Sequence, residues 1–189
     1  MDIRPLRLPG CYEIRPPRLA DQRGCFVKPF RSDVFRRLGM EVDFQEQYYS
    51  ESVRGVLRGM HFQTPPTDHA KLVYCVRGHV LDAGIDLRRG SPTYGEHVVL
   101  ELSSKKGNAV FLPRGIAHGF YVVDEQATVV YSVTSVHSPD HDRGVRWNSA
   151  GIRWPTTSPI VSERDAALPP LDGFDSPFIF EPDLLRRAS

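Results

Sequence analysis

The sequence has few cysteines, almost no net charge and no long apolar run, and each shortage excludes a class of protein. The three cysteines (Cys11, Cys25 and Cys75) are odd in number and lack metal-ligand spacing. We therefore expect a reduced, cytoplasmic compartment rather than a disulfide framework. A formal net charge of +1 argues against binding of nucleic acid or a membrane surface through bulk charge. No stretch approaches the roughly 20 apolar residues of a membrane span, and residues 1–10 hold no apolar core of a signal peptide.

The residues that are present suit one globular domain. Hydrophobic residues make up 40% of the 189 and charged residues 25%, which is ordinary for such a chain. The 16 prolines and 15 glycines indicate many turns and therefore many short elements. There is no internal repeat, low-complexity segment or linker. We expect a single domain over residues 1–171 and a tail over residues 172–189, with Phe174, Phe178 and Phe180 as apolar anchors.

Short stretches of strand character follow one another between Gly and Pro residues. This spacing predicts an all-β sandwich or barrel. Two short helices are also expected, one over residues 32–38, capped by Ser32 and ended by Gly39, and one over residues 162–168. The predicted strands are residues 25–30, 44–50, 56–63, 70–76, 79–87, 94–102, 108–113, 118–123 and 128–134.

The stretch from Arg54 to Gln63 carries the most chemistry. In a period-2 pattern, His61 and Gln63 share one side with small Gly59, and Arg58 falls on the other side. A strand face with a histidine, an amide and a glycine is typical of a pocket wall. A lone strand histidine is nevertheless more often structural than catalytic, so the functional interpretation depends on its neighbours.

At this point several separated motifs resemble one family, the dTDP-4-dehydrorhamnose 3,5-epimerases, over about residues 21–171. The family implies a cupin-type, jelly-roll double-sheet barrel with a few short helices at its ends, a homodimer, and neither metal nor cofactor. The activity implied is inversion at C3, C5 or both of a nucleotide-linked, dTDP-type 4-keto-6-deoxyhexose in deoxysugar biosynthesis. The motifs are Arg58-Gly-Met-His-Phe-Gln63, Lys71-Leu-Val, Gly90-Ser-Pro-Thr-Tyr-Gly95, Pro113-Arg-Gly-Ile-Ala-His-Gly-Phe120 and Ser162-Glu-Arg-Asp165.

The resemblance assigns four residues to proton transfer beside the C4 ketone. His61 matches the base, and its ordinary pKa near 6.5 suits that role. Asp165 matches its carboxylate partner, although its place three residues after Ser162 also fits a helix capping box. Lys71 matches the cation that stabilises the enolate. Tyr131 matches the acid on the opposite face of the sugar, although a core tyrosine is the alternative.

The resemblance also assigns residues to substrate binding. Arg23 and Arg58 match phosphate-binding residues, because the forked donors of a guanidinium group suit phosphate oxygens. Arg23 lies in the turn of residues 21–24, which in this family crosses to the partner subunit. Two positions depart from the family pattern, because Lys28 replaces a common acidic residue and His137 replaces an aromatic residue that helps to hold the sugar. His137 leaves open whether one or both carbons are inverted. The binding set is Arg23, Phe26, Gln45, Gln47, Arg58, Asp82, His118 and His137.

Three other classes compete with this interpretation. A metal-dependent cupin usually has two histidines one residue apart, and the sequence His61-Phe-Gln63 lacks that pair. A non-catalytic sugar-binding module would need no proton-transfer residues. A serine or cysteine hydrolase would need a nucleophile motif, which is not found. Within the resembling superfamily, an epimerase that inverts only C3 or only C5, on a different sugar nucleotide, is the remaining alternative.

Overall fold

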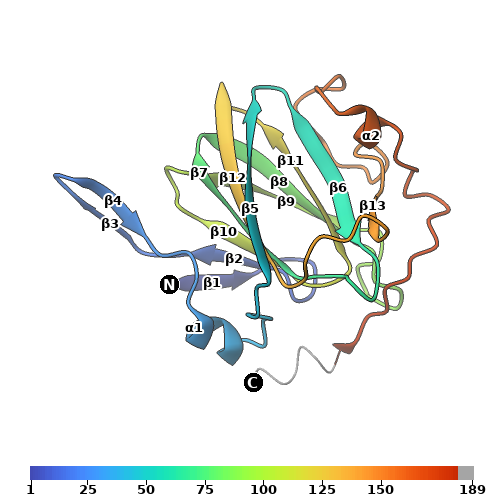
Figure 1. The fold of residues 1–189 in the computed structure, drawn as a ribbon, viewed down its shortest axis with the longest axis horizontal. Helices are drawn as coiled ribbons and strands as arrows, with labels where there is room; N and C mark the ends of the chain where they lie inside the picture. Colours follow the sequence, from blue (N-terminus) through green and yellow to red (C-terminus); the bar gives the residue numbers. More distant parts are fainter. Residues whose placement is uncertain (183–189) are drawn as a thin grey trace.

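The structure is a computed structural model that describes residues 1–182 of the chain. Two antiparallel sheets face each other and form a barrel, with a two-stranded hairpin extending away from it (Figure 1). The strand order is β1-β2-β10-β7-β12-β5 in the first sheet and β13-β6-β11-β8-β9 in the second. Residues 183–189, the end of the predicted tail, lie outside the described residues.

All nine predicted strands overlap observed ones, and the structure adds β1, β2, β3 and β13. In chain order the elements are β1 (Asp2–Pro5), β2 (Tyr12–Arg15), β3 (Arg18–Asp21), β4 (Gly24–Val27), α1 (Ser32–Arg37), β5 (Glu46–Val53), β6 (Leu57–Gln63), β7 (Lys71–Arg77), β8 (His79–Asp86), β9 (His97–Ser103), β10 (Ala109–Leu112), β11 (Ile116–Val122), β12 (Gln126–Val133), β13 (Asp142–Gly144) and α2 (Glu163–Ala166).

The main core lies between the two sheets. Val73 on β7, Val110 on β10 and Val129 on β12 point inward from the first sheet and meet Phe120 and Val122 on β11 of the second. Residues at i and i+2 of each strand share this face, as the period of a strand requires. Tyr131 belongs to the same cluster, so the inward face of β12 carries a phenol from the apolar core toward the polar end of the barrel.

The outer faces of both sheets are covered as well. Phe35 of α1 packs against Phe111 of β10 on the first sheet. On the second sheet, Phe62 of β6 packs edge-on against Phe174 and Phe178 of the C-terminal segment. Phe178 is buried there and Phe174 partly buried, and the third predicted tail anchor, Phe180, is partly buried with its ring centroid 5.1 Å from the guanidinium carbon of Arg88. The proposed division of the chain after residue 171 stays a prediction.

Both predicted helices form, with one cap differing from expectation. The expected cap of α1 is wrong, because Arg31 occupies the N-cap position, without a side-chain cap bond, and Ser32 is already helical. Gly39 follows the helix with φ +69°, and Met40 N donates to Phe35 O, so this end is a Schellman motif as Gly39 predicts. At α2, Ser162 is the N-cap.

A β-bulge in β6 overturns part of the predicted alternation. His118 of β11 pairs with His61, but Phe120 pairs with Arg58, so β6 has one extra residue between these pairs. Residues directly opposite one another point to the same face of a sheet. Arg58 therefore lies on the inward face together with His61, and the prediction that it lies on the other side is wrong.

The hairpin of β3 and β4 stands clear of the barrel (Figure 1). All residues of β3 are exposed, and Leu19 and Phe26 are large apolar side chains open to solvent. No helix in the described part of the chain is long and apolar enough to cross a membrane.

Candidate active site

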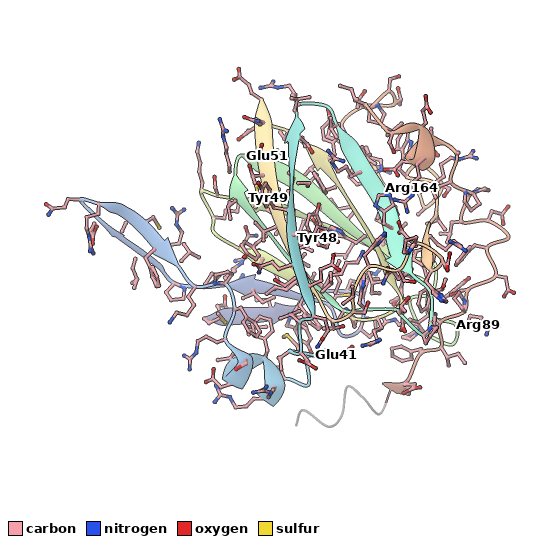
Figure 2. The ribbon with its side chains drawn as sticks, viewed as in Figure 1. Glu41, Tyr48, Tyr49, Glu51, Arg89 and Arg164 are labelled. Atoms are coloured by element: carbon pink, nitrogen blue, oxygen red, sulfur yellow. The ribbon has the colours of Figure 1, made fainter. Side chains whose placement is uncertain are left out.

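A cavity of about 310 Å³ opens at the polar end of the barrel, between β5 of the first sheet and β6 of the second. His61, Gln63 and Lys71 line it, and so do Tyr48 and Arg164, which are labelled in Figure 2. A larger cavity of about 610 Å³ lies between α1 and the C-terminal segment, away from the proton-transfer residues expected from the sequence. The chemistry therefore belongs to the smaller cavity.

His61 and Asp165 form a hydrogen-bonded pair across 104 residues of sequence. The distance from His61 Nε2 to Asp165 Oδ1 is 2.7 Å. Asp165 Oδ2 also accepts a hydrogen bond from Gly59 N, at 3.1 Å. Burial opposes ionisation of Asp165, but the bonds from His61 and Gly59 outweigh it and hold the pKa of this carboxyl below its ordinary value. The pair is thus a buried carboxylate that orients an accessible imidazole.

The capping box and the His–Asp pair prove compatible. Ser162 Oγ accepts a hydrogen bond from the backbone N–H of Asp165, at 3.1 Å, which caps α2. That bond uses the backbone of Asp165 and leaves both carboxylate oxygens for His61 and Gly59. The cap fixes the start of α2 and so aims the carboxylate at β6.

Lys71 begins β7 and is 5% exposed. Its Nζ donates to the backbone O of His61, at 2.9 Å, which holds the ammonium beside the base. Burial lowers the pKa of Lys71 to about 8, while the carboxylates of Asp142 and Asp82 partly oppose that shift. At neutral pH the site therefore carries a poorly solvated cation, which favours negative charge developing nearby.

A second His–Asp pair lies deeper in the barrel. The distance from His118 Nε2 to Asp82 Oδ2 is 2.8 Å, and both side chains are buried. Burial raises the pKa of Asp82, although its interactions with His118 and Lys71 oppose this. His118 is the direct cross-strand partner of His61, so the two pairs are neighbours along the inward face of the second sheet.

Tyr131 lies behind the cavity rather than along its wall. It is 7% exposed, its ring packs edge-on against His118, and its hydroxyl is 3.3 Å from Ser50 Oγ. Burial raises the pKa of Tyr131, with smaller opposing effects from the Ser50 hydrogen bond and the Arg58 charge. The phenol is therefore protonated at neutral pH. The ring of Tyr48 stacks on it, with centroids 4.8 Å apart.

These contacts can support proton abstraction beside a carbonyl. An oriented base, a poorly solvated cation and a protonated phenol are the groups needed to remove a proton, hold an enolate and return a proton. Within residues 1–182, no three His, Cys, Asp or Glu side chains converge as a metal site requires. The model of one family, dTDP-4-dehydrorhamnose 3,5-epimerase, matches residues 5–173.

The chain belongs to that family. It is therefore an epimerase, in the isomerase class, of the deoxysugar-biosynthesis type. The predicted jelly-roll barrel is confirmed by the two facing sheets and by the structural neighbours of the epimerase.

Three relatives illustrate the likeness. The dTDP-4-dehydrorhamnose 3,5-epimerase of Shigella flexneri is 36% identical over 168 residues, which cover 87% of this chain and 93% of that protein. The dTDP-4-dehydrorhamnose 3-epimerase of Streptomyces niveus is 40% identical over 168 residues, covering 87% and 81% respectively. The 3,5-epimerase of Legionella pneumophila, solved with dTDP-4-keto-L-rhamnose, superposes with a TM-score of 0.90 at 31% identity and covers 95% of this chain and 99% of its own.

The cavity of the epimerase also contains residues that sequence reasoning missed. Glu46 and Tyr48 line it, whereas Gln45 precedes β5 and Gln47 occupies the other face of the strand, where Gln47 Nε2 donates to Ser132 Oγ. The strand alternation within residues 44–50, which puts Glu46 and Tyr48 on one face and Gln47 on the other, was the signal that could have found them. His69 is also in the wall, and burial, together with nearby positive charges, lowers its pKa to about 3, so it is neutral.

The remaining predicted binding residues divide into two groups. His137 lines the cavity, and its backbone N–H donates to Glu46 Oε2, at 2.8 Å. Arg58 faces inward and its Nε donates to Ser52 Oγ, at 2.9 Å. Arg23 and Phe26 lie on the exposed hairpin, away from this chain's own cavity.

Proposed function

We propose that this epimerase acts on a dTDP-linked 4-keto-6-deoxyhexose, with His61 as the base. The observation that carries the proposal is the 2.7 Å bond between His61 and buried Asp165, with Lys71 fixed on the carbonyl of the same histidine. In the chair of a 4-keto-6-deoxyglucose, the C3 and C5 hydrogens are axial on one face. One base can therefore reach either carbon if the sugar shifts slightly.

In the proposed reaction His61 removes a proton from the carbon beside the ketone. The C–H electron pair forms a C=C bond, and the C4 oxygen takes the negative charge of an enolate. The Asp165 carboxylate stabilises the imidazolium that results. Lys71 Nζ, charged below pH 8, stabilises the enolate oxygen.

Inversion requires a new proton on the opposite face of the sugar. Tyr131 is the proposed donor, because its phenol is protonated at neutral pH and its strand belongs to the sheet facing His61. Its hydroxyl donates a proton to carbon as the enolate collapses to the ketone. The phenolate then takes a proton from water and the His61 imidazolium releases its proton to water, so both groups return to their starting states. Ser50 Oγ, 3.3 Å from the phenol, is placed to relay that proton.

The nucleotide is proposed to be dTDP and the assembly a homodimer. Support for dTDP comes from relatives such as the Legionella pneumophila enzyme, solved with a dTDP-sugar. Support for a dimer is the hairpin, which exposes Phe26 and Leu19 to solvent and holds Arg23 far from the cavity of its own chain. In a dimer, the partner subunit's hairpin would bring a phosphate-binding arginine beside Arg58.

The proposed compartment is reducing and cytoplasmic. Cys11, Cys25 and Cys75 are all free thiols, and Cys11 and Cys75 are buried. Burial raises the pKa of the Cys11 thiol to about 12 and that of Cys75 to about 11, which suppresses the thiolate form that reacts.

A second candidate is inversion at C3 alone. It is favoured by the 3-epimerase of Streptomyces niveus among the relatives and by His137 at a position where the resemblance expects an aromatic residue. The test is proton NMR of dTDP-4-keto-6-deoxyglucose with the enzyme in deuterated water. Deuterium at both C3 and C5 supports the double epimerase, and deuterium at one carbon supports the single one. Exchange at neither carbon would contradict both candidates.

A further inference from the structure

Tyr48 is the member of a stacked tyrosine pair that lines the substrate cavity, and Tyr131 is the other member. The two tyrosines are direct partners across β5 and β12, and their rings stack with an interplanar angle of 17°. Of this pair, Tyr48 contributes to the wall of the 310 Å³ cavity, whereas Tyr131 is almost completely covered. A sugar in this cavity would therefore contact the ring of Tyr48, and it would have to meet the Tyr131 hydroxyl past the edge of that ring.

The cavity places Tyr48 on the sheet opposite His61. β5 belongs to the first sheet and β6 to the second, and both residues line the same space. A flat sugar held between them would have its axial C3 and C5 hydrogens toward His61 and its other face toward the Tyr48 ring. On the same side of the cavity, Glu46 and Lys71 are charged, and the aliphatic side chain of Val133 also contributes to the lining. Among the lining residues of the first sheet, Tyr48 is thus the one that offers an aromatic face.

The Tyr48 phenol also remains neutral. Burial, together with the negative charges of Glu46 and Asp142, raises its pKa to about 12. A neutral ring presents its face to C–H groups without repelling the enolate that forms at C4. Since the ring is braced by Tyr131 behind it, its orientation is fixed before a sugar binds.

Resting on the proposed function, we propose that Tyr48 determines which carbon is inverted. Its ring supports the sugar face opposite His61 and limits the tilt that presents C3 or C5 to the base. It also restricts which of the two carbons reaches the Tyr131 hydroxyl. Tyr48 is therefore a specificity-determining residue, and it transfers no proton itself.

The test compares deuterium exchange at C3 and C5 of dTDP-4-keto-6-deoxyglucose for the wild type, Tyr48→Ala, Tyr48→Phe and Tyr49→Ala. Tyr49 is a matched control, because it is the next residue of β5, points to the other face and is 68% exposed. Both tyrosines are labelled in Figure 2. We expect Tyr48→Ala to change the ratio of C5 to C3 exchange by about fivefold, the equivalent of a ring contact of about 1 kcal/mol.

Tyr48→Phe should keep the wild-type ratio, because the ring and its stacking are retained, and Tyr49→Ala should keep it as well. An unchanged ratio in folded Tyr48→Ala, or an equal loss of exchange at both carbons, would overturn the inference. If Tyr48→Ala does not fold, Tyr48→Leu, which keeps an apolar contact with Tyr131, replaces it with the same expected change. If the wild type exchanges deuterium and Tyr48→Ala keeps the wild-type ratio, only this inference is refuted. Absence of exchange in the wild type refutes the proposed function and this inference with it.

Discussion

Replacing Lys71 with methionine should stabilise the fold at neutral pH while removing activity. The folded protein lowers the pKa of Lys71 from 10.5 to about 8, because the ammonium is buried. That shift means that burying the charged form costs about 3 kcal/mol relative to the unfolded chain. Methionine has a similar length without charge, so it removes this cost.

The substitution also removes one favourable contact. Lys71 Nζ donates to the backbone O of His61, and loss of that bond costs about 1 kcal/mol. The net gain at pH 7 is therefore about 2 kcal/mol, or a rise in Tm of roughly 4–8 °C for a chain of this length.

The sign of the effect should reverse with pH. Below pH 8 Lys71 is charged in both the folded and the unfolded state, so its burial cost is fully present. As pH rises from 8 to 10.5, the folded state has lost the proton while the unfolded chain still binds it, and the wild type gains stability. Above pH 10.5 only the lost hydrogen bond remains, so Lys71→Met should be the less stable protein by about 1 kcal/mol.

Thermal unfolding of the wild type and of Lys71→Met between pH 7 and pH 11 measures this difference in stability. The titration of groups that both proteins share cancels from it. Lys105→Met is the matched control, because Lys105 is exposed and its substitution should leave Tm unchanged at every pH. A Lys71→Met protein that is less stable than the wild type at pH 7 by the same amount as at pH 11 would refute the reasoning. It would show that Lys71 is not a strained, desolvated cation.

Three further substitutions test the other groups of the site. Asp165→Asn should lower turnover by about 10- to 100-fold and leave dTDP affinity unchanged, because a charge-assisted bond to His61 of about 1.5–3 kcal/mol is lost. Unchanged turnover, measured by NMR, would exclude the pair from catalysis. Tyr131→Phe should still exchange deuterium on the His61 side but form inverted product about 100-fold more slowly, and product formation at the wild-type rate would assign the acid elsewhere. Arg58→Ala should raise KM about tenfold with little change in kcat if it binds phosphate, and a fall in kcat alone would contradict that role.

The sequence predicted the strands better than it predicted their pairing. Nine strand segments were recognised from local alternation, but β13 was missed because Asp142 to Gly144 are polar and become a strand only by pairing with β6. The bulge in β6 was missed for the same reason, since an extra residue is visible only against its partner β11. Pairing is a long-range property, and it decided which way Arg58 points.

The site shows the same limit. Local reasoning favoured a helix cap for Asp165, and only the resemblance to a family indicated its pairing with His61, 104 residues away. Tyr48 was overlooked because the choice within residues 44–50 fell on Gln45, which precedes β5, and on Gln47, whose face of the strand is turned away from the cavity. The partner contacts of the hairpin residues stay a prediction.

The central claim is that His61 removes the proton beside the ketone. The most direct measurement is deuterium incorporation into dTDP-4-keto-6-deoxyglucose by the wild type and by His61→Ala, with dTDP affinity measured for both proteins. We predict that His61→Ala loses exchange at C3 and C5 by about a thousandfold or more while it binds dTDP with nearly the wild-type affinity. Exchange by His61→Ala at the wild-type rate would contradict the account and require a different base.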